Sequence, residues 1–478
     1  MVRENLRGRP MTTSVSGAEA PVDKRLIGHP LGLMFLVLGE GFERFAYYGT
    51  SSILALFLTK QLLLPGHAEH VVGLGVLKTL LGAGGALTVV AFATLLVGRY
   101  GFMCYVTPLA GGWVADRWLG RSRTIALGAI LMLIGYGLMA FEASFVAAIA
   151  LILLGVGCFK GNIAAQIGDL YSADDLRRSS GFQLFTLSIQ AGSIFAPIVC
   201  GGLAAAYGWK YGFFAAGASM ALGLATLTFG QPWLPKPALP QKAGGEARPR
   251  LTRRDWIVIA VLAGMVPALS LSAVGNMQIF NTYLIWGDQH YNLVFFGKTM
   301  PAAWLVSLDA IVSVGCLIAV LAFWRLWAQF WREPEDLTKM IIGCLISATA
   351  PLLLAAASVQ EAATGQKIGL MWGVAFHVVN DIGFVNIYGV GMALFTRAAP
   401  KSLSAVMIAI YYFYLAFGNE LAGRLGGLLE TLGPVKFWML HAALCAAGAV
   451  MLLVFGLVFG RLLRPDDEAD MVAEPAAA

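Results

Sequence analysis

The sequence GEGFERFAYYG, residues 39–49, places three charged side chains in a segment that is otherwise apolar enough to sit in lipid. Five polar side chains recur in it at i, i+3, i+4, i+7 and i+8: Glu40, Glu43, Arg44, Tyr47 and Tyr48. On a helix this spacing puts all five on one face. A charge at the centre of a bilayer costs about 2.5–3.5 kcal/mol, so this face is predicted to meet a partner or a wet cavity.

The composition of the whole chain indicates a protein that crosses the membrane many times. Of its 478 residues, 58% are hydrophobic and only 13% are charged, whereas soluble domains have about 25% charged residues. The first thirty residues are polar and basic and contain no apolar run. We therefore expect no cleavable signal peptide.

Twelve apolar segments are long enough to span a bilayer. Their approximate bounds are 32–62, 92–115, 123–141, 145–168, 181–206, 211–231, 256–286, 301–328, 338–359, 367–395, 402–425 and 435–461. A further apolar stretch, 71–90, is rich in glycine, and we predict that it is an extended or partly re-entrant start of the second span.

Lysine and arginine lie mostly on one side of these twelve spans. That side carries Arg3, Arg7, Arg9, Lys24, Arg25, Arg117, Arg121, Arg123, Arg177, Arg178, Lys236, Lys242, Arg248, Arg250, Arg253, Arg254, Arg332, Lys339, Arg397, Lys401, Arg461 and Arg464. The opposite loops have few, such as Lys210, Lys298 and Lys367. The positive-inside rule predicts that both termini are cytoplasmic, and the compact loops favour a bacterial inner membrane. This placement accounts for the net charge of +6 without a nucleic-acid partner.

The sequence shows no pattern typical of a cofactor site or of an enzyme. All six cysteines fall within apolar spans and none forms CxxC, so we interpret them as small buried hydrophobic residues. The six histidines have no metal-ligand spacing, and no Ser/His/Asp arrangement is visible. We expect no cofactor or metal, no catalysis and no obligate protein partner.

A linker rich in proline, glycine and charge divides the spans into six and six. The predicted organisation is an N-terminal segment, a six-helix bundle, a cytoplasmic linker, a second six-helix bundle and a tail, at residues 1–30, 31–231, 232–255, 256–463 and 464–478. The fold class is thus all-α integral membrane, with substrate expected near the midplane between the two bundles.

The loop GGWVADRWLGRSR, residues 111–123, resembles the loop between the second and third helices of the major facilitator superfamily. The matching positions are Gly112, Asp116, Arg117, Gly120, Arg121 and Arg123. Glycines there let helices approach closely, while the acid and the arginines pair with neighbouring helix ends. The resemblance implies the major facilitator type of fold.

The pattern E-x-x-E-R-F-x-Y-Y-G at residues 40–49 resembles the first-helix motif of the proton-dependent oligopeptide transporter family. Residues 104–120, CYVTPLAGGWVADRWLG, are similar to its second helix, residues 155–171, GVGCFKGNIAAQIGDLY, to its fourth, and residues 182–197, FQLFTLSIQAGSIFAP, to its fifth. The C-terminal half resembles the family more weakly, through residues 301–309, 382–400 and 418–423.

The resemblance implies a proton-coupling cluster. Glu40, Glu43 and Arg44 match the family's cluster, and Lys160 matches the fourth-helix lysine that the family pairs with it. Competition between Lys160 and Arg44 for a carboxylate would let protonation release a salt bridge and bias a gate. The alternative is a static group of ion pairs that only joins the first and fourth helices.

The resemblance also implies a set of substrate-binding residues. Tyr47, Tyr48 and Tyr105 match the family's substrate-facing tyrosines. Asn162 belongs to the fourth-helix motif, and Gln190 occupies the position of a substrate-contacting asparagine. Trp304 stands where the eighth helix carries a tryptophan.

This sequence departs from the family mainly at positions that the resemblance assigns to substrate binding. Ser51 replaces a common arginine, and Phe384 replaces the tenth-helix glutamate; these two are the family's usual anchors for the carboxylate and amine of a peptide. Gly161 replaces a proline, Thr186 a tyrosine and Met277 the seventh-helix acid.

Two other acids lie near these changed positions, Asp309 and Asp381, and His377 precedes Asp381 by one helical turn. We hypothesise that Asp309 or Asp381 replaces the lost amine anchor or the seventh-helix acid, because acids within the membrane are costly and usually functional. His377 and Asp381 are expected to share a proton. The alternative is that the acids line a wet vestibule or cap a broken helix.

Three functions are consistent with these patterns. The first is a symporter in which protons drive the uptake of di- and tripeptides by alternating access. The second keeps the proton-coupled mechanism for another small metabolite, an amino acid or a peptide-like compound. The third, a membrane sensor or assembly factor that does not transport, is disfavoured because such a protein would not need buried charges.

Overall fold

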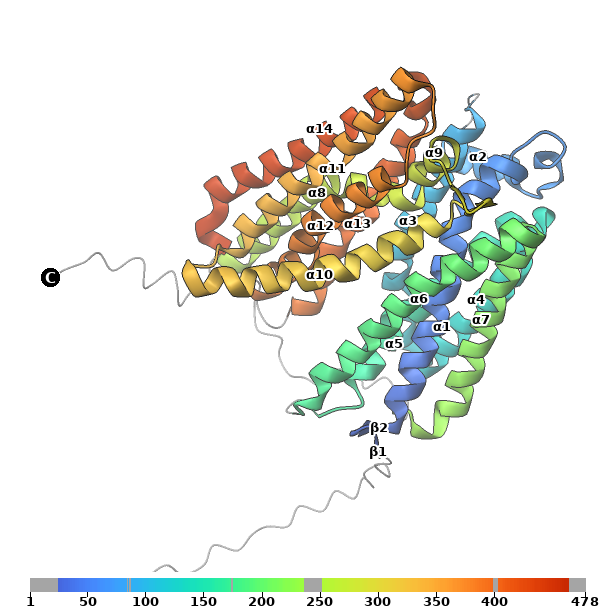
Figure 1. Ribbon diagram of the computed structural model, residues 1–478. Helices are drawn as coiled ribbons and strands as arrows, with labels where there is room; N and C mark the ends of the chain where they lie inside the picture. The colour runs from blue at the N-terminus through green and yellow to red at the C-terminus, as the bar shows by residue number, and fades with distance from the viewer. Residues whose placement is uncertain are drawn as a thin grey trace, which may run out of the picture.

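The computed structural model describes residues 25–83, 85, 87–172, 175–235, 252–398 and 403–463, which form an all-α membrane protein (Figure 1). Most of the predicted N-terminal segment, linker and tail lie outside these residues. The long helices are α1 Leu31–Phe57, α3 Val89–Val114, α4 Arg121–Met139, α5 Phe145–Gly168, α6 Arg177–Tyr207, α7 Trp209–Gly230, α8 Arg253–Met277, α10 Trp304–Phe330, α11 Asp336–Thr364, α12 Met371–Ala398, α13 Ser404–Gly426 and α14 Leu428–Phe459.

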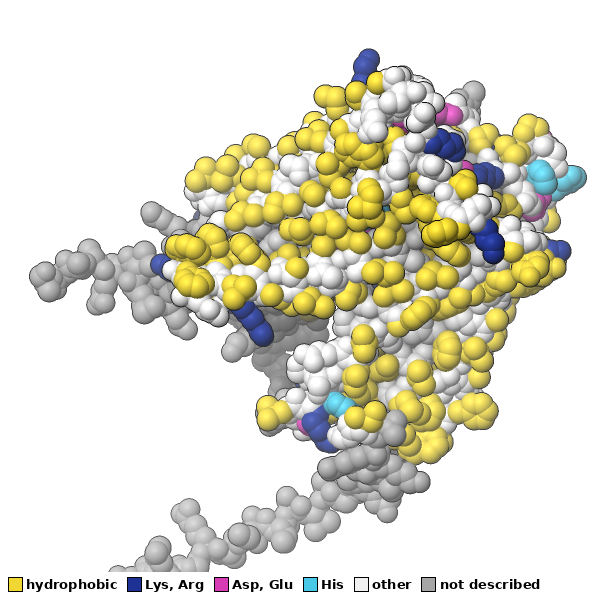
Figure 2. All heavy atoms as spheres, in the orientation of Figure 1, with side chains coloured by type: hydrophobic (Ala, Val, Ile, Leu, Met, Phe, Trp, Pro, Cys, Tyr) yellow, Lys and Arg dark blue, Asp and Glu magenta, His cyan; other side chains and the backbone are white. Residues whose placement is uncertain are grey.

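Eleven helices in the described part of the chain are long and apolar enough to cross a membrane. The one long helix outside this group is α1, which carries Glu40, Glu43 and Arg44 and is therefore more polar. Two π turns extend the first two spans, η1 Leu58–Leu62 after α1 and η3 Ala115–Leu119 after α3. Figure 2 shows hydrophobic side chains along the flanks of both bundles, as expected for surfaces that face lipid.

The helices form two bundles, α1 and α3–α7 in the N-terminal half and α8–α14 in the C-terminal half (Figure 1). Small residues let helices approach closely within each bundle. A Cβ at Gly128 of α4 would lie 2.7 Å from the carbonyl oxygen of Gly155 in α5. Similarly, a Cβ at Gly343 of α11 would lie 2.6 Å from the carbonyl oxygen of Gly383 in α12.

The prediction for the apolar stretch 71–90 is wrong. These residues contain a separate short helix, α2 Leu74–Leu80, and the second span begins only at Val89. Gly73 and Gly82 flank α2 with φ of +81° and +70°, backbone angles that stop the helix from continuing in either direction. The helix is too short to span, and its Leu80 side chain is 76% exposed.

The seventh span is broken, although the sequence predicts one continuous span over 256–286. After α8, a 3₁₀ turn, η6 Gln278–Phe280, leads to Asn281 with φ −127° and ψ −114°, and α9 Thr282–His290 follows. Side-chain amides bind backbone groups at the break: Gln278 Oε1 accepts from the Thr282 N–H at 3.2 Å, and Asn281 Nδ2 donates to the Thr94 carbonyl at 3.1 Å. Such partners make irregular backbone tolerable at membrane depth.

The two ends of the molecule differ in how closely the bundles approach. We call the end with α2, α9 and the hairpin β3 Val294–Phe295 and β4 Lys298–Thr299 the hairpin end, and the opposite end, with the hairpin β1 Arg25–Leu26 and β2 His29–Pro30, the linker end. In Figure 1 the bundles meet near the hairpin end and diverge toward the linker end.

Polar contacts join the bundles in the half of the molecule nearer the hairpin end. They include Lys60 Nζ to Asp288 Oδ2 at 2.6 Å and Arg99 Nη2 to Glu420 Oε1 at 2.7 Å. Trp304 Nε1 donates to the carbonyl of Ile198 at 3.1 Å. These contacts hold that end closed.

Candidate functional site

The charged residues of α1 form a compact buried group. Arg44 Nε lies 2.9 Å from Glu40 Oε1 and 2.5 Å from Glu43 Oε2. None of the three residues is more than 4% exposed. A glycine of α6 makes room for this group, because a Cβ at Gly192 would lie 2.8 Å from Arg44 Cβ. We call Glu40, Glu43 and Arg44 the α1 triad.

The α1 triad has more negative than positive groups. With all three side chains ionised its charge is −1, and one added proton would make it neutral. Both oxygens of Glu43 and Oε2 of Glu40 lack a hydrogen-bond partner among the described residues. Arg44 therefore holds the carboxylates mainly by charge.

Lys160 does not pair with the α1 triad in this conformation. Its Nζ lies over the ring of Tyr105, 4.4 Å from the centroid, and it makes no ion pair with the described residues. It remains within electrostatic range of Glu40. Of the two cations expected to compete for a carboxylate, Arg44 is the one that pairs with Glu40 and Glu43 in this conformation. Lys160 instead makes a cation–π contact with Tyr105.

Half-buried aromatic side chains from both bundles meet beside the α1 triad. Tyr48 lies 6.0 Å from Phe280, and Tyr105 lies 6.4 Å from Tyr412, as measured between ring centroids. The Tyr412 hydroxyl in turn lies 3.2 Å from that of Tyr388. We call these five residues the aromatic lining. They place hydroxyl groups and ring faces at the boundary between the bundles, which suits a ligand of mixed polarity.

The sequence predicted two members of the aromatic lining, Tyr48 and Tyr105, which belong to the N-terminal bundle. It did not predict the three members from the C-terminal bundle: Phe280, Tyr388 and Tyr412. Tyr47 lies behind the aromatic lining, 5.2 Å from Tyr48 and 6.4 Å from Tyr100 between ring centroids. A signal for Tyr388 and Tyr412 was present in the run of aromatic residues at 411–414 and in Tyr388 itself.

Three other predicted substrate residues have different surroundings. Asn162, 4% exposed, donates through Nδ2 to the carbonyls of Cys158 at 2.8 Å and Gly111 at 3.3 Å, so its amide joins α5 to α3. Trp304 belongs to the contact between the bundles. Gln190 is half-buried on α6, two residues before the glycine that faces Arg44.

Three positions at which the resemblance predicts a charged side chain hold uncharged ones: Ser51 and Phe384 at the two expected anchors and Met277 at the expected seventh-helix acid. Ser51 is buried, and its hydroxyl has no partner among the described residues. Phe384 stacks on Tyr388 with a centroid distance of 5.6 Å. The sulfur of Met277 lies 3.0 Å from Asn419 Nδ2.

The acids of the C-terminal bundle are arranged differently from the prediction. His377 does not share a proton with Asp381; its Nδ1 lies 2.8 Å from Asp309 Oδ1. Asp381 is 1% exposed and accepts a hydrogen bond from Asn380 Nδ2 at 3.1 Å. The helical spacing of one turn was correct, but the His377 ring turns toward α10. Within the described residues, no group of three His, Cys, Asp or Glu side chains could hold a metal ion.

The family model of the POT family matches residues 122–248 and 252–439, about two thirds of the chain. The chain belongs to the POT family. A di-/tripeptide transporter of Lactococcus lactis subsp. cremoris is 26% identical over 90% of this chain and 96% of that protein.

Solved POT structures share the fold. A crystal structure of a POT peptide transporter in complex with sulfate superposes with a TM-score of 0.78 at 22% identity, covering 94% of this chain and 98% of that one. A POT family transporter crystallised with 5-aminolevulinic acid gives a TM-score of 0.70 at 22% identity, covering 91% of this chain and 98% of that one.

Proposed function

We propose that this POT family protein is a symporter that uses protons to import di- and tripeptides. The observation that carries the proposal is the buried α1 triad directly beside the aromatic lining. The Lactococcus relative, which is named a di-/tripeptide transporter, supports the same substrate class. Proton coupling follows from the family, and the net charge of the triad supports it.

In the proposed mechanism, a proton binds to a carboxylate of the α1 triad. Protonating Glu40 or Glu43 removes one of the two charges that hold Arg44, so the guanidinium gains freedom to move. Lys160, which lies over Tyr105, supplies a second positive charge beside the aromatic lining. A substrate with both a carboxylate and an amide would pair with these cations and with the tyrosine hydroxyls.

Alternating access would occur by rocking of the two bundles. The contacts of Lys60 with Asp288 and of Arg99 with Glu420 close the hairpin end in the present conformation. Their release, together with approach of the bundles at the linker end, would expose the aromatic lining to the opposite side. Because lysine and arginine gather at the linker end, we assign that end and both termini to the cytoplasm of a bacterial cell.

The direct test is uptake of labelled di-alanine into proteoliposomes with and without an inward proton gradient. We expect the wild-type protein to accumulate the peptide only with the gradient. Glu43→Gln is expected to reduce uptake to the level without a gradient, because the amide cannot take up the coupling proton. Glu69→Gln is the matched control, since this glutamate is exposed and lies outside the site. Peptide accumulation by Glu43→Gln equal to wild type would contradict the coupling role.

A second candidate keeps the mechanism and changes the substrate. Ser51 and Phe384 leave the usual positions for binding peptide termini without charge, and a POT family transporter crystallised with 5-aminolevulinic acid shows that a non-peptide binds within this family. Here Asp309 or Asp381 would bind the substrate amine. Failure of unlabelled dipeptides to compete for uptake, in protein that exchanges 5-aminolevulinic acid, would favour this candidate.

A further inference from the structure

The C-terminal bundle contains a chain of hydrogen-bonding side chains that the mechanism above does not use. Asp309 Oδ1 lies 2.8 Å from His377 Nδ1, and His377 Nε2 lies 3.0 Å from the Tyr283 hydroxyl. The Tyr283 hydroxyl lies 3.3 Å from that of Tyr291. The chain thus runs from α10 through α12 to α9, the short helix after the break in the seventh span.

We propose that Asp309 and His377 form a second proton-binding site, which is linked through Tyr283 to α9 and to the contacts that close the hairpin end. This inference rests on the proposed proton-coupled transport. The ligand is a proton, held on the imidazole with the Asp309 carboxylate as its counter-ion. The site lies in the other bundle from the α1 triad.

The contact between the two side chains and the partial exposure of Asp309 support a proton-binding role. His377 is fully buried, whereas the Asp309 side chain is 16% exposed, so the carboxylate end of the pair is the one open to solvent or substrate. An imidazole and a carboxylate in contact can exist as a neutral and a charged ring with little rearrangement. A histidine needed only for packing would not require a carboxylate, which is costly within the membrane.

Protonation of His377 would reverse a hydrogen bond. If the proton of the neutral ring is on Nδ1, this N–H donates to Asp309 and Nε2 accepts from the Tyr283 hydroxyl. Once a proton binds to Nε2, that nitrogen donates to the Tyr283 oxygen, and the Tyr283 hydroxyl must turn to donate to Tyr291. The only covalent bond formed is the N–H bond at Nε2 of His377, and the added proton stays on the imidazole ring.

This reversal acts on a helix that closes the hairpin end. Tyr283 lies in α9, which also carries Asp288, the partner of Lys60 from the N-terminal bundle, and which follows Asn281, bonded to α3. A changed hydrogen bond at Tyr283 therefore alters the element that joins the two bundles. The broken seventh span lets α9 respond without moving α8.

Other titratable groups near the pair belong to several elements. Asp381 lies one turn further along α12, and its Oδ2 has no hydrogen-bond partner among the described residues. Cys316 of α10 donates from Sγ to the Val378 carbonyl at 3.7 Å. Tyr48 of α1 lies within electrostatic range of Asp309. None of these side chains is a cation, so the charged imidazole would depend on carboxylates.

The transport experiment compares His377→Gln and Asp309→Asn with wild type in proteoliposomes. Exchange of labelled for unlabelled dipeptide, which needs no net proton movement, is expected to persist in His377→Gln. Gradient-driven uptake should fall, and the pH profile of uptake should flatten in the same way in both variants and in the double variant. His67→Gln is the control, because His67 also contacts a carboxylate, Glu142 at 2.9 Å, but at the surface.

A pH profile and gradient response unchanged in His377→Gln would overturn the inference. A wild-type protein without peptide exchange would instead refute the peptide proposal, and the site is then tested directly. In ¹⁵N-histidine spectra of the full chain, the His377 ring should gain a proton as the pH is lowered, and the pH of this change should be displaced in Asp309→Asn. A His377 ring that keeps one protonation state at every pH at which the protein stays folded would overturn the inference. This second test does not depend on whether His377→Gln folds.

Discussion

The two bundles bury their charged groups in different ways. In the N-terminal bundle, Glu40, Glu43 and Arg44 occupy little more than one turn of a single helix, α1, so a change in their charge acts first within that helix. In the C-terminal bundle, Asp309 and His377 lie on different helices and connect to a third. A change in charge there acts on how helices are placed. The first arrangement suits proton binding next to a ligand, and the second suits control of a gate.

The largest effect is expected when the positive charge of the α1 triad is removed. Arg44→Gln would remove the cation that pairs with two buried carboxylates, and breaking a buried ion pair in this way costs about 3–5 kcal/mol. We expect a clear fall in the unfolding midpoint of the detergent-solubilised protein above neutral pH. The midpoint should recover partly on acidification, because protonated carboxyls no longer need the guanidinium.

Asp381→Asn is the matched change in the C-terminal bundle. Asp381 is 1% exposed, and among the described residues it has one hydrogen-bond donor, Asn380, and no cation in contact. The amide removes a buried charge at nearly constant volume, so the unfolding midpoint should stay the same or rise. If Arg44→Gln and Asp381→Asn lowered the midpoint equally, the contrast between the two bundles would be wrong.

A smaller effect is expected where the bundles touch. A Cβ at Gly98 of α3 would lie 2.5 Å from the Gly423 Cα and from the Asn419 carbonyl oxygen in α13. Forcing an extra carbon into such a contact costs about 1–3 kcal/mol, so Gly98→Ala should favour conformations in which the hairpin end is open. Hydrogen exchange of the backbone in α9 and at the end of α13 should rise.

The control for Gly98→Ala is Gly112→Ala in the same helix. The sequence predicted a close approach of helices at Gly112, and this is wrong, because a Cβ there would meet no atom within 4 Å. The only expected effect of Gly112→Ala is the small gain in helix propensity. Faster hydrogen exchange in α9 in both variants would mean that the effect is not due to contact between the bundles.

Much of the N-terminal bundle could be predicted from the sequence because its signals are local. The spacing of Glu40, Glu43 and Arg44 predicts one face of one helix, and the structure brings them together on that face. The bounds of the long helices follow from runs of apolar residues, which must satisfy their backbone internally in a membrane.

The C-terminal bundle was less predictable because its features depend on contacts between distant segments. The break at Asn281 is stabilised by partners in α3 and by Gln278, and hydropathy does not detect either of them. Likewise, the partner of His377 is determined by the rotation of α12 against α10. The spacing of one helical turn predicted Asp381 as the partner of His377. In the structure the partner is Asp309, which lies on a different helix.

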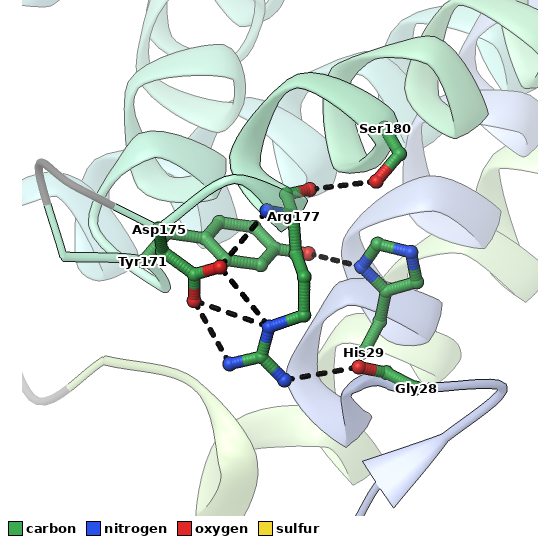
Figure 3. A network of polar contacts seen from close by, with 6 residues as sticks. All are labelled: Gly28, His29, Tyr171, Asp175, Arg177 and Ser180. Carbon is green, nitrogen blue, oxygen red and sulfur yellow. Dashed lines mark hydrogen bonds and ion pairs between the residues drawn. The ribbon is translucent and has the colours of Figure 1, made fainter.

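The smallest expected effect concerns a polar network at the linker end of the N-terminal bundle (Figure 3). Asp175 accepts hydrogen bonds from the backbone N–H of Arg177 at 2.9 Å and from its Nη2 at 2.8 Å, and Arg177 Nη1 donates to the Gly28 carbonyl at 3.0 Å. His29 and Tyr171 add a contact of 2.9 Å beside it. The network fastens the segment before α1 to the start of α6, within one bundle.

These hydrogen bonds, from the Arg177 side chain first and its backbone second, lower the pKa of Asp175 below its ordinary value. A lowered pKa in the folded state means that the stabilisation is complete above the ordinary carboxyl pKa of about 3.9 and is lost as the pH falls through the lower folded value. Asp175→Asn should therefore lower the unfolding midpoint slightly at pH 7 and leave it unchanged in strong acid. Ser180→Ala, which removes an uncharged hydrogen bond to the Arg177 carbonyl, should give the same difference at both pH values.

Because the network lies in one bundle and on the solvent side of the helices, neither variant should alter the coupling of uptake to the proton gradient. A loss of gradient-driven uptake in Asp175→Asn would show that the linker end takes part in coupling, and the division of roles between the α1 triad and the C-terminal pair would then be incomplete.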